Sequence, residues 1–181
     1  MSERAEQPPE SAALPSERAA PPTEIADVVG GPGWILRGSD LRPAIVDLPA
    51  FRAGLAEDPL GPVLERLWSD EPGEALRMLA EHSATLRTRA LRADCLRDLG
   101  ARDEAVDAYD SLVEETAGTP REATMRQHRG KALLAADRID DAVADFRIAV
   151  ALRRSSDPSL LASAEQALSF GLRCRERRAR G

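Results

Sequence analysis

Few residues of this chain have the type and spacing that catalysis or metal binding needs. We interpret its two histidines, His82 and His128, as isolated helix-surface residues. Cys95 and Cys174 lie far apart, without the paired spacing of a zinc site, and are predicted to be free thiols. Residues 30–33 (GGPG) precede an apolar segment rather than a helix that follows a strand, which disfavours a phosphate-binding loop. We therefore predict no catalytic residue, no metal site and no cofactor.

Arginine carries nearly all of the positive charge, because Lys131 is the only lysine in the chain. We single out five of the arginines in the central helical region: Arg87, Arg89, Arg92, Arg126 and Arg129. They form either a surface for an acidic peptide, through bidentate bonds to carboxylates, or ion pairs with Asp and Glu of neighbouring helices. The dense basic run at residues 173–180 (RCRERRAR) either complements the dipole of a helix end or contacts an acidic partner or RNA.

Composition excludes several classes of protein. The net charge of −6 and the pI of about 5.1 argue against a dedicated nucleic-acid-binding protein, which needs concentrated positive charge. No apolar segment reaches the roughly 18 residues of a membrane span. Residues 1–22 lack the apolar stretch of a signal peptide, so we expect a cytoplasmic location. Abundant Ala and Arg are typical of GC-rich bacterial genomes. Aromatics make up only 3% of the chain, so its core must consist largely of Ala, Leu and Val.

Helical signals dominate from residue 49 onward. Proline follows an acidic or hydroxyl residue at four predicted helix starts: Pro59, Pro72, Pro120 and Pro158. Apolar residues recur at helical spacing between these positions, and no useful length of chain alternates with period two. The pattern predicts an all-α fold without a sheet. We expect helices at residues 49–57, 59–69, 72–82, 84–99, 101–117, 120–136, 138–154 and 158–177.

A three-residue phrase, acidic residue then alanine then branched aliphatic, occurs three times. Its alanines are Ala75, Ala105 and Ala142, and each is followed four positions later by a large apolar residue. The spacings bracket the roughly 34-residue period of helix–turn–helix repeats. The repetition predicts a solenoid of about three helical hairpins, in which each repeat packs on its neighbours and a final helix covers the exposed end.

Residues 59–154 resemble tetratricopeptide repeats, although Sel1-like and other α-solenoids share much of the pattern. The expected packing positions of the second and third copies are Ala93, Gly100, Ala105, Tyr109, Gly130, Ala142 and Phe146. The first copy is degenerate, because Val63 stands where a small residue is expected and Leu79 replaces the aromatic. Neither complete copy has the tryptophan near the start of its first helix, and the closing proline arrives late.

The resemblance implies a concave groove that binds a peptide or a partner helix. It places two sets of first-helix residues side by side as groove candidates: Ala90, Asp94 and Arg97, then Gln127, Lys131 and Leu134. Members of the family that clamp a chaperone's terminal carboxylate use lysine and asparagine at such positions. Ala90, Asp94 and Gln127 are the wrong groups for that clamp. An exposed, solvated side chain is the plain alternative for Lys131.

The chain divides into four predicted segments. Residues 1–30 form a Pro/Glu/Ala-rich disordered tail, and residues 31–57 form a Gly-rich segment with a short helix. Residues 58–156 hold the repeats, and residues 157–181 form a capping helix with a basic end. The apolar Trp34–Leu36 stretch either caps the first helices or serves as a docking motif.

The leading hypothesis is a non-catalytic cytoplasmic adaptor that holds a protein segment in its groove, as a monomer or with weak self-association. A regulatory or RNA-associated protein that uses its Arg-rich C-terminal helix is the alternative. A structural subunit that self-associates through an open end of the solenoid is the third possibility. No membrane partner is expected, and nucleic acid is disfavoured.

Overall fold

The computed structural model of this chain describes residues 24–155 and 157–181, and this part is mostly helical, as predicted. Three short strands come first: β1 (Val28–Gly31), β2 (Trp34–Leu36) and β3 (Pro43–Ile45). Eight helices follow: α1 (Leu48–Gly54), α2 (Gly61–Trp68), α3 (Pro72–Leu79), α4 (Leu86–Asp98), α5 (Arg102–Thr116), α6 (Glu122–Ala135), α7 (Ile139–Arg153) and α8 (Pro158–Arg180). Each predicted helix therefore has a counterpart in the structure.

Local signals explain where several helices begin. Pro72 and Pro158 occupy the first turns of α3 and α8, where a missing N–H costs no hydrogen bond. Asp157 caps α8 by accepting a hydrogen bond from the backbone N–H of Ser159. The prolines at positions 59 and 120 lie outside helices, because α2 and α6 begin two residues later. At these two sites the proline marks the approach to the helix rather than its start.

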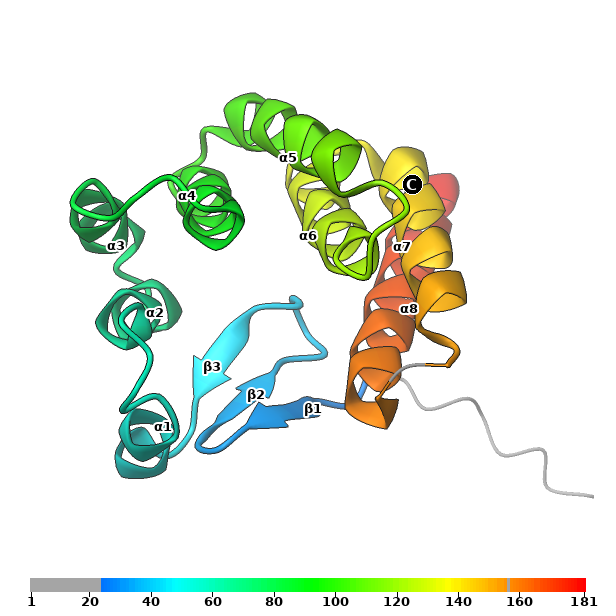
Figure 1. Cartoon of the computed structure of the whole chain (residues 1–181). Helices are drawn as coiled ribbons and strands as arrows, with labels where there is room; N and C mark the ends of the chain where they lie inside the picture. Colours follow the sequence, from blue (N-terminus) through cyan, green and yellow to red (C-terminus); the bar gives the residue numbers. More distant parts are fainter. Residues whose placement is uncertain (1–23, 156) are drawn as a thin grey trace, which may run out of the picture.

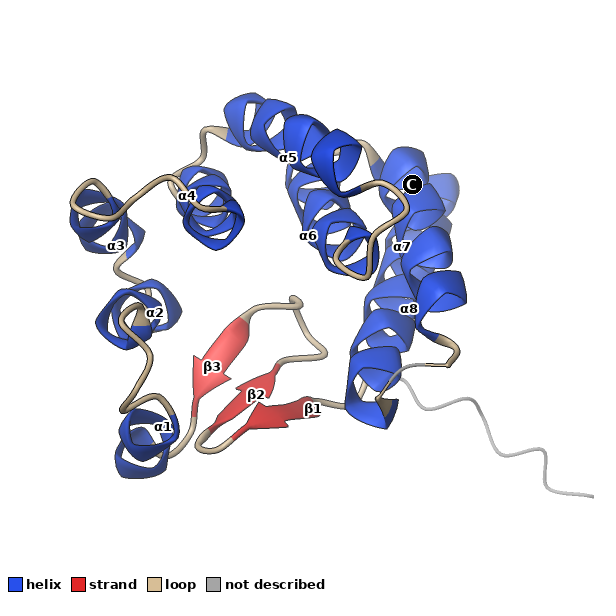
Figure 2. Cartoon of the chain, viewed as in Figure 1, coloured by secondary structure: helices blue, strands red, loops and turns tan. Residues whose placement is uncertain are grey.

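The helices follow one another around an arc, and from α2 to α8 each packs against its neighbours in the sequence (Figure 1). The strands lie on the inner side of this arc, between α2 at one end and α8 at the other (Figure 2). The segment of residues 28–45 therefore occupies the concave side of the helical layer. The Trp34–Leu36 stretch, interpreted as a cap or a docking motif, forms the middle strand of this inner sheet.

The three-stranded antiparallel sheet corrects the expectation of a chain without strands. The β1–β2 turn consists of Pro32 and Gly33, and Gly33 adopts a φ of 72°, a left-handed conformation that glycine tolerates well. The strands are only three or four residues long, which is too short for a period-two pattern to stand out. A Pro-Gly pair between two apolar runs is a turn signal that favoured a hairpin here.

Two apolar clusters form the core, and α4 contributes to both. The first cluster joins α4 to the later helices and includes Tyr109 and Phe146, which are both fully buried. The second joins α1, α2 and α3 to the other side of α4 and is centred on Phe51. Leu41, in the loop between β2 and β3, is buried in the first cluster. The sheet is thereby anchored to the core of the helices.

The predicted packing positions occupy the places that close helix contact requires. Ala75, Ala105 and Ala142, the alanines of the repeated phrase, are all fully buried, as is Ala93. Gly100 ends α4 with a φ of 89°, and the turn into α5 follows. A Cβ atom at Gly130 would overlap the ring of Phe146, so this glycine allows α6 and α7 to approach closely.

The predicted boundary between the tail and the next segment, at residue 30, differs from the structure. Most of the predicted tail lies outside the described residues, but its boundary at residue 30 falls inside β1. Asp27, also assigned to the tail, accepts a hydrogen bond of 2.8 Å from the backbone N–H of Gly38. Within residues 24–155 and 157–181, no helix combines the length and apolar character needed to cross a membrane.

Candidate binding cavity

A cavity of about 400 Å³ lies between the sheet and the concave faces of the helices. Its walls come from the three strands, the loop between β2 and β3, and helices α2, α4, α6, α7 and α8. One part is apolar, with Trp34, Trp68, Leu67 and Leu91, whereas the part near α6 is polar. A volume of this size suits a small molecule or the end of a chain.

The sheet is held against the helices by bonds at both of its sides. Gln166 of α8 donates hydrogen bonds to the carbonyl oxygens of Ala26 and Leu36, at 2.8 and 2.9 Å. Arg42, in the β2–β3 loop, lies 3.1 Å from the carboxylate of Asp98 in α4. These contacts hold the sheet in place as one wall of the cavity.

Aromatic rings form the apolar end. The ring centroids of Trp34 in β2 and Trp68 in α2 are 4.5 Å apart, and Phe51 in α1 lies 5.5 Å from Trp68. Trp34 and Trp68 both line the cavity, whereas Phe51 is buried behind them. This end offers flat apolar surface to a ligand.

Asp94 is the centre of a polar network on the α4 side. Its carboxylate lies 2.7 Å from Arg97 and 3.2 Å from the Nδ1 atom of His128 in α6. Burial alone would raise the pKa of Asp94, but the charges of Arg97 and His128 outweigh burial and hold the pKa well below its usual range. Asp94 is therefore ionised, and its charge is matched within the network.

Tyr109 supports this network from the core. Its hydroxyl donates a hydrogen bond of 2.9 Å to the carbonyl oxygen of Ala90 and lies 3.4 Å from Nδ1 of His128. Burial and the nearby Asp94 charge raise the pKa of Tyr109 well above its ordinary value, so the phenol is neutral. His128 is thus positioned by two side chains.

Lys131 faces the cavity without an ion pair to any residue that the structure describes. Lys131 is partly buried rather than exposed, and the surface that it keeps faces the cavity. Burial, with a further contribution from the Arg97 charge, lowers its pKa to about 8 against the partial opposition of Asp94. The interpretation of Lys131 as an ordinary solvated lysine is therefore wrong.

Arg153, at the end of α7, is the second unusual cation. It donates hydrogen bonds to the side-chain oxygen of Gln127, to the carbonyl oxygen of Leu160 at 3.0 Å and to the hydroxyl of Thr124 at 3.1 Å. All of these acceptors are neutral, and burial lowers the pKa of Arg153. Gln127 is fixed in turn by hydrogen bonds to Ser163 of α8.

The structure brings together four of the six groove candidates. Asp94, Arg97, Gln127 and Lys131 all line the cavity. The other two candidates, Ala90 and Leu134, belong to the first apolar cluster or pack against it. The concave side is nevertheless not the open groove that the resemblance implied, because β1, β2 and the loop after β2 cover it.

Sequence reasoning missed several cavity residues, among them His128 and Arg153, and the sheet that forms one wall. His128 was interpreted as an isolated surface residue, but it contacts Asp94, which lies 34 positions away in the sequence. Arg153 lies at the end of α7, the second helix of the third repeat, and the repeat pattern assigns ligand contacts only to first helices. A single arginine among many gives no sequence signal, and only its burial to 5% exposure distinguishes it.

The five arginines of the central region pair mainly with acids. Arg87 lies 2.5 Å from Asp58, and Arg89 lies 2.5 Å from Glu115. Asp145 lies 3.1 Å from Arg126 and 2.6 Å from Arg129. The fifth, Arg92, donates to the carbonyl oxygen of Leu79. These contacts confirm the ion-pairing interpretation over a free arginine surface.

The basic end of α8 lies outside the cavity. Arg178 donates a hydrogen bond of 2.9 Å to the carbonyl oxygen of Asp137, and Arg177 lies 3.2 Å from the sulfur of Cys174. Among the described residues, no group of three or more His, Cys, Asp or Glu side chains is arranged to hold a metal ion. Comparison with protein-family models, curated proteins and solved structures found no match.

Proposed function

We propose that this protein is a non-catalytic binding module built on a tetratricopeptide-like solenoid, and that the cavity is its binding site. The observation that carries this proposal is the position of Asp94, Arg97, Gln127 and Lys131. The resemblance assigns these side chains of α4 and α6 to ligand contact, and all four line one cavity.

The helix packing supports the solenoid part of the proposal. Consecutive helices contact each other along the chain, and the small residues of the repeated phrase are buried where the helices meet. Repeats of this kind cannot bury their apolar faces alone and depend on stacked neighbours. Helix α8 covers the last hairpin through its contacts with α7.

The ligand of this module is short. A whole partner helix or a long extended peptide needs the concave side free, but the sheet occupies it and is anchored by Leu41, Arg42 and Gln166. The remaining space of about 400 Å³ suits a small molecule or the terminal residues of a partner. This narrows the hypothesis of an adaptor with an open peptide groove.

The two tryptophans provide a direct test. Trp34 and Trp68 are the only tryptophans of the chain, and both line the cavity. A ligand that enters should change the intrinsic fluorescence and raise the melting temperature, because binding to the folded state alone stabilises it. The experiment screens small molecules and short peptides against the full chain with both readouts. If no compound or peptide of any charge changes either signal, the cavity is not a binding site.

A further inference from the structure

We infer that the cavity binds a small organic anion whose oxyanion group contacts Lys131 and Arg153 and whose apolar body lies against Trp34 and Trp68. This inference rests on the proposed function, since it names the class of ligand for the same site. It requires a surplus of positive charge at one end of the cavity and an apolar surface at the other.

The surplus follows from how the charged side chains around the cavity pair. Its lining contains five Arg or Lys residues and three Asp residues. Arg97 is paired with Asp94 and Asp98, and Arg42 is paired with Asp98 and Asp70. A third cation of the lining, Arg37, is paired with Asp40. Among residues 24–155 and 157–181, this leaves Lys131 and Arg153 without a carboxylate partner.

The two unpaired cations lie near each other. Gln127 bonds Arg153 and stands one helical turn before Lys131 on α6. The charge of Arg153 also helps to lower the pKa of Lys131, which places the two groups within electrostatic reach. Like charges held together at low solvent exposure are costly, and an anion between them removes that cost.

Arg153 keeps donors for a ligand. A guanidinium has five N–H groups, and the hydrogen bonds to Gln127, Leu160 and Thr124 use three of them. Planar oxyanions, such as carboxylates, and phosphates suit the donors that remain. The hydrogen bonds already made hold the group in place, so little rotamer entropy is lost on binding.

The other end of the cavity selects the body of the ligand. Trp34 and Trp68 with Leu67 and Leu91 supply flat and aliphatic surface. They come from β2, α2 and α4, whereas Lys131 and Arg153 come from α6 and α7. An inorganic anion would leave this apolar end empty, so a ligand with a separate apolar part fits better.

The first test compares three probes of one shape. Isothermal titration calorimetry measures binding of 3-phenylpropanoate, 3-phenylpropanamide and 3-phenylpropylamine to the full chain, with phenyl phosphate as a second oxyanion. We expect the carboxylate, the phosphate or both to bind at least about tenfold more tightly than the amide, because hydrogen bonds to charged groups contribute about 1.5–3 kcal/mol. The positively charged amine should show no detectable binding, because Lys131 and Arg153 carry the same charge. The better of the two oxyanions identifies the head group.

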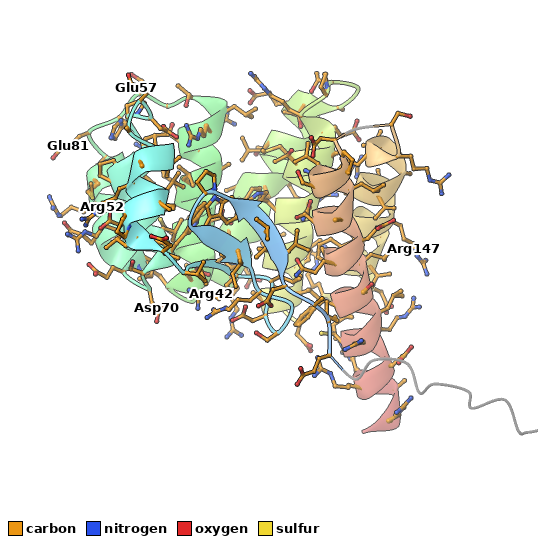
Figure 3. All side chains as sticks on the ribbon, turned by 90° about the horizontal axis from the view of Figure 1, so that it is seen from below. Arg42, Arg52, Glu57, Asp70, Glu81 and Arg147 are labelled. Atoms are coloured by element: carbon orange, nitrogen blue, oxygen red, sulfur yellow. The ribbon has the colours of Figure 1, made fainter. Side chains whose placement is uncertain are left out.

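Variants assign the head group to its residues. Lys131→Met and Arg153→Met should each lower the affinity for the anion about tenfold or more. Arg147→Met is the matched control on α7, because Arg147 is exposed and lies on the outer side of the helices (Figure 3). Arg153→Met removes buried hydrogen bonds and can unfold the chain. If Arg153→Met does not fold, the result for Lys131→Met alone decides the variant test.

A measurement on the unmodified protein avoids variants altogether. An anion beside Lys131 raises its pKa from about 8, so binding at pH 8 takes up as much as about half a proton. Calorimetry in two buffers of different ionisation enthalpy measures this uptake. Three results would overturn the inference and leave the proposed function intact: an amide that binds as tightly as both the carboxylate and the phosphate, unchanged anion binding by Lys131→Met, or absence of proton uptake. If no compound binds, neutral compounds included, both this inference and the proposed function are wrong.

Discussion

One nitrogen of Arg42 lies between two carboxylates, 3.1 Å from Asp98 at the end of α4 and 3.0 Å from Asp70 after α2. The two acids differ in environment, because the side chain of Asp98 is 9% exposed and that of Asp70 is 81% exposed. Figure 3 shows Arg42 and Asp70 side by side near the sheet. The loop that closes the cavity is thus joined to the helices at this guanidinium.

The two carboxylates should contribute unequally to stability. Asp98→Asn removes a nearly buried carboxylate that contacts both Arg42 and Arg97, and we expect a loss of about 1–3 kcal/mol. Asp70→Asn should cost less than about 1 kcal/mol, as exposed pairs do, and asparagine tolerates the positive φ at this position. Chemical denaturation measures both, and hydrogen exchange of residues 28–45 should accelerate only for Asp98→Asn. Equal effects would show that burial does not distinguish the pairs.

Gly130 should not tolerate the smallest possible side chain. Alanine usually stabilises a helix interior relative to glycine, but a Cβ atom here overlaps the buried ring of Phe146. We expect Gly130→Ala to lower the free energy of unfolding by about 1–3 kcal/mol. Gly73→Ala in α3 is the control, because its nearest side-chain atom is 3.9 Å away and the change should stabilise by about 0.5 kcal/mol. A stabilising Gly130→Ala would contradict the close approach of α6 and α7.

Ala105 tests the packing of the repeated phrase. It is fully buried in the first apolar cluster, so Ala105→Asp places a carboxylate there without a partner. The expected loss is about 3 kcal/mol or more, measured by thermal and denaturant unfolding. Ala144→Asp on the exposed face of α7 introduces the same group into solvent and should be nearly neutral. Unchanged stability of Ala105→Asp would mean that the repeat phasing is incorrect.

The buried ammonium of Lys131 should cost stability near neutral pH. Its folded pKa is lowered to about 8, below the 10.5 of a free lysine, so the unfolded chain binds the proton more tightly between these values. Lys131→Met should therefore be more stable than the wild type at pH 7, by about 1–2 kcal/mol. The difference in unfolding free energy between Lys131→Met and the wild type should decrease as pH rises from 8 toward 10.5.

The comparison with the variant isolates this contribution from other groups. Burial raises the pKa of Cys95 to about 12, which makes its own contribution fall as pH rises above 9. Cys95 is present in both proteins, so the difference in unfolding free energy between wild type and Lys131→Met cancels its effect. A difference that does not change from pH 7 to 10 would show that Lys131 is not perturbed.

Much of the helical part of the fold was predictable because its signals are local. Pro72 and Pro158 mark helix starts through their own geometry, and Gly100 marks a helix end through its positive φ. The alanines of the repeated phrase are buried because a helix places such residues on one face. The resemblance to tetratricopeptide repeats, rather than the periodicity alone, selected Asp94 and Arg97 of α4 and Gln127 and Lys131 of α6 as candidates.

The sequence by itself determined the eight helices, the small residues where they meet and most of the polar side chains on their inner face. Only the tertiary structure decided what encloses that face. Residues 28–45 form strands too short to give a periodic signal, and Gln166 bonds Leu36 across 130 positions of sequence. The pairing of Asp94 with His128 depends on long-range packing, and so does the absence of a carboxylate partner for Lys131 and Arg153 within the described part of the chain. Helix formation depends on neighbours in sequence, whereas a cavity depends on which distant segments meet.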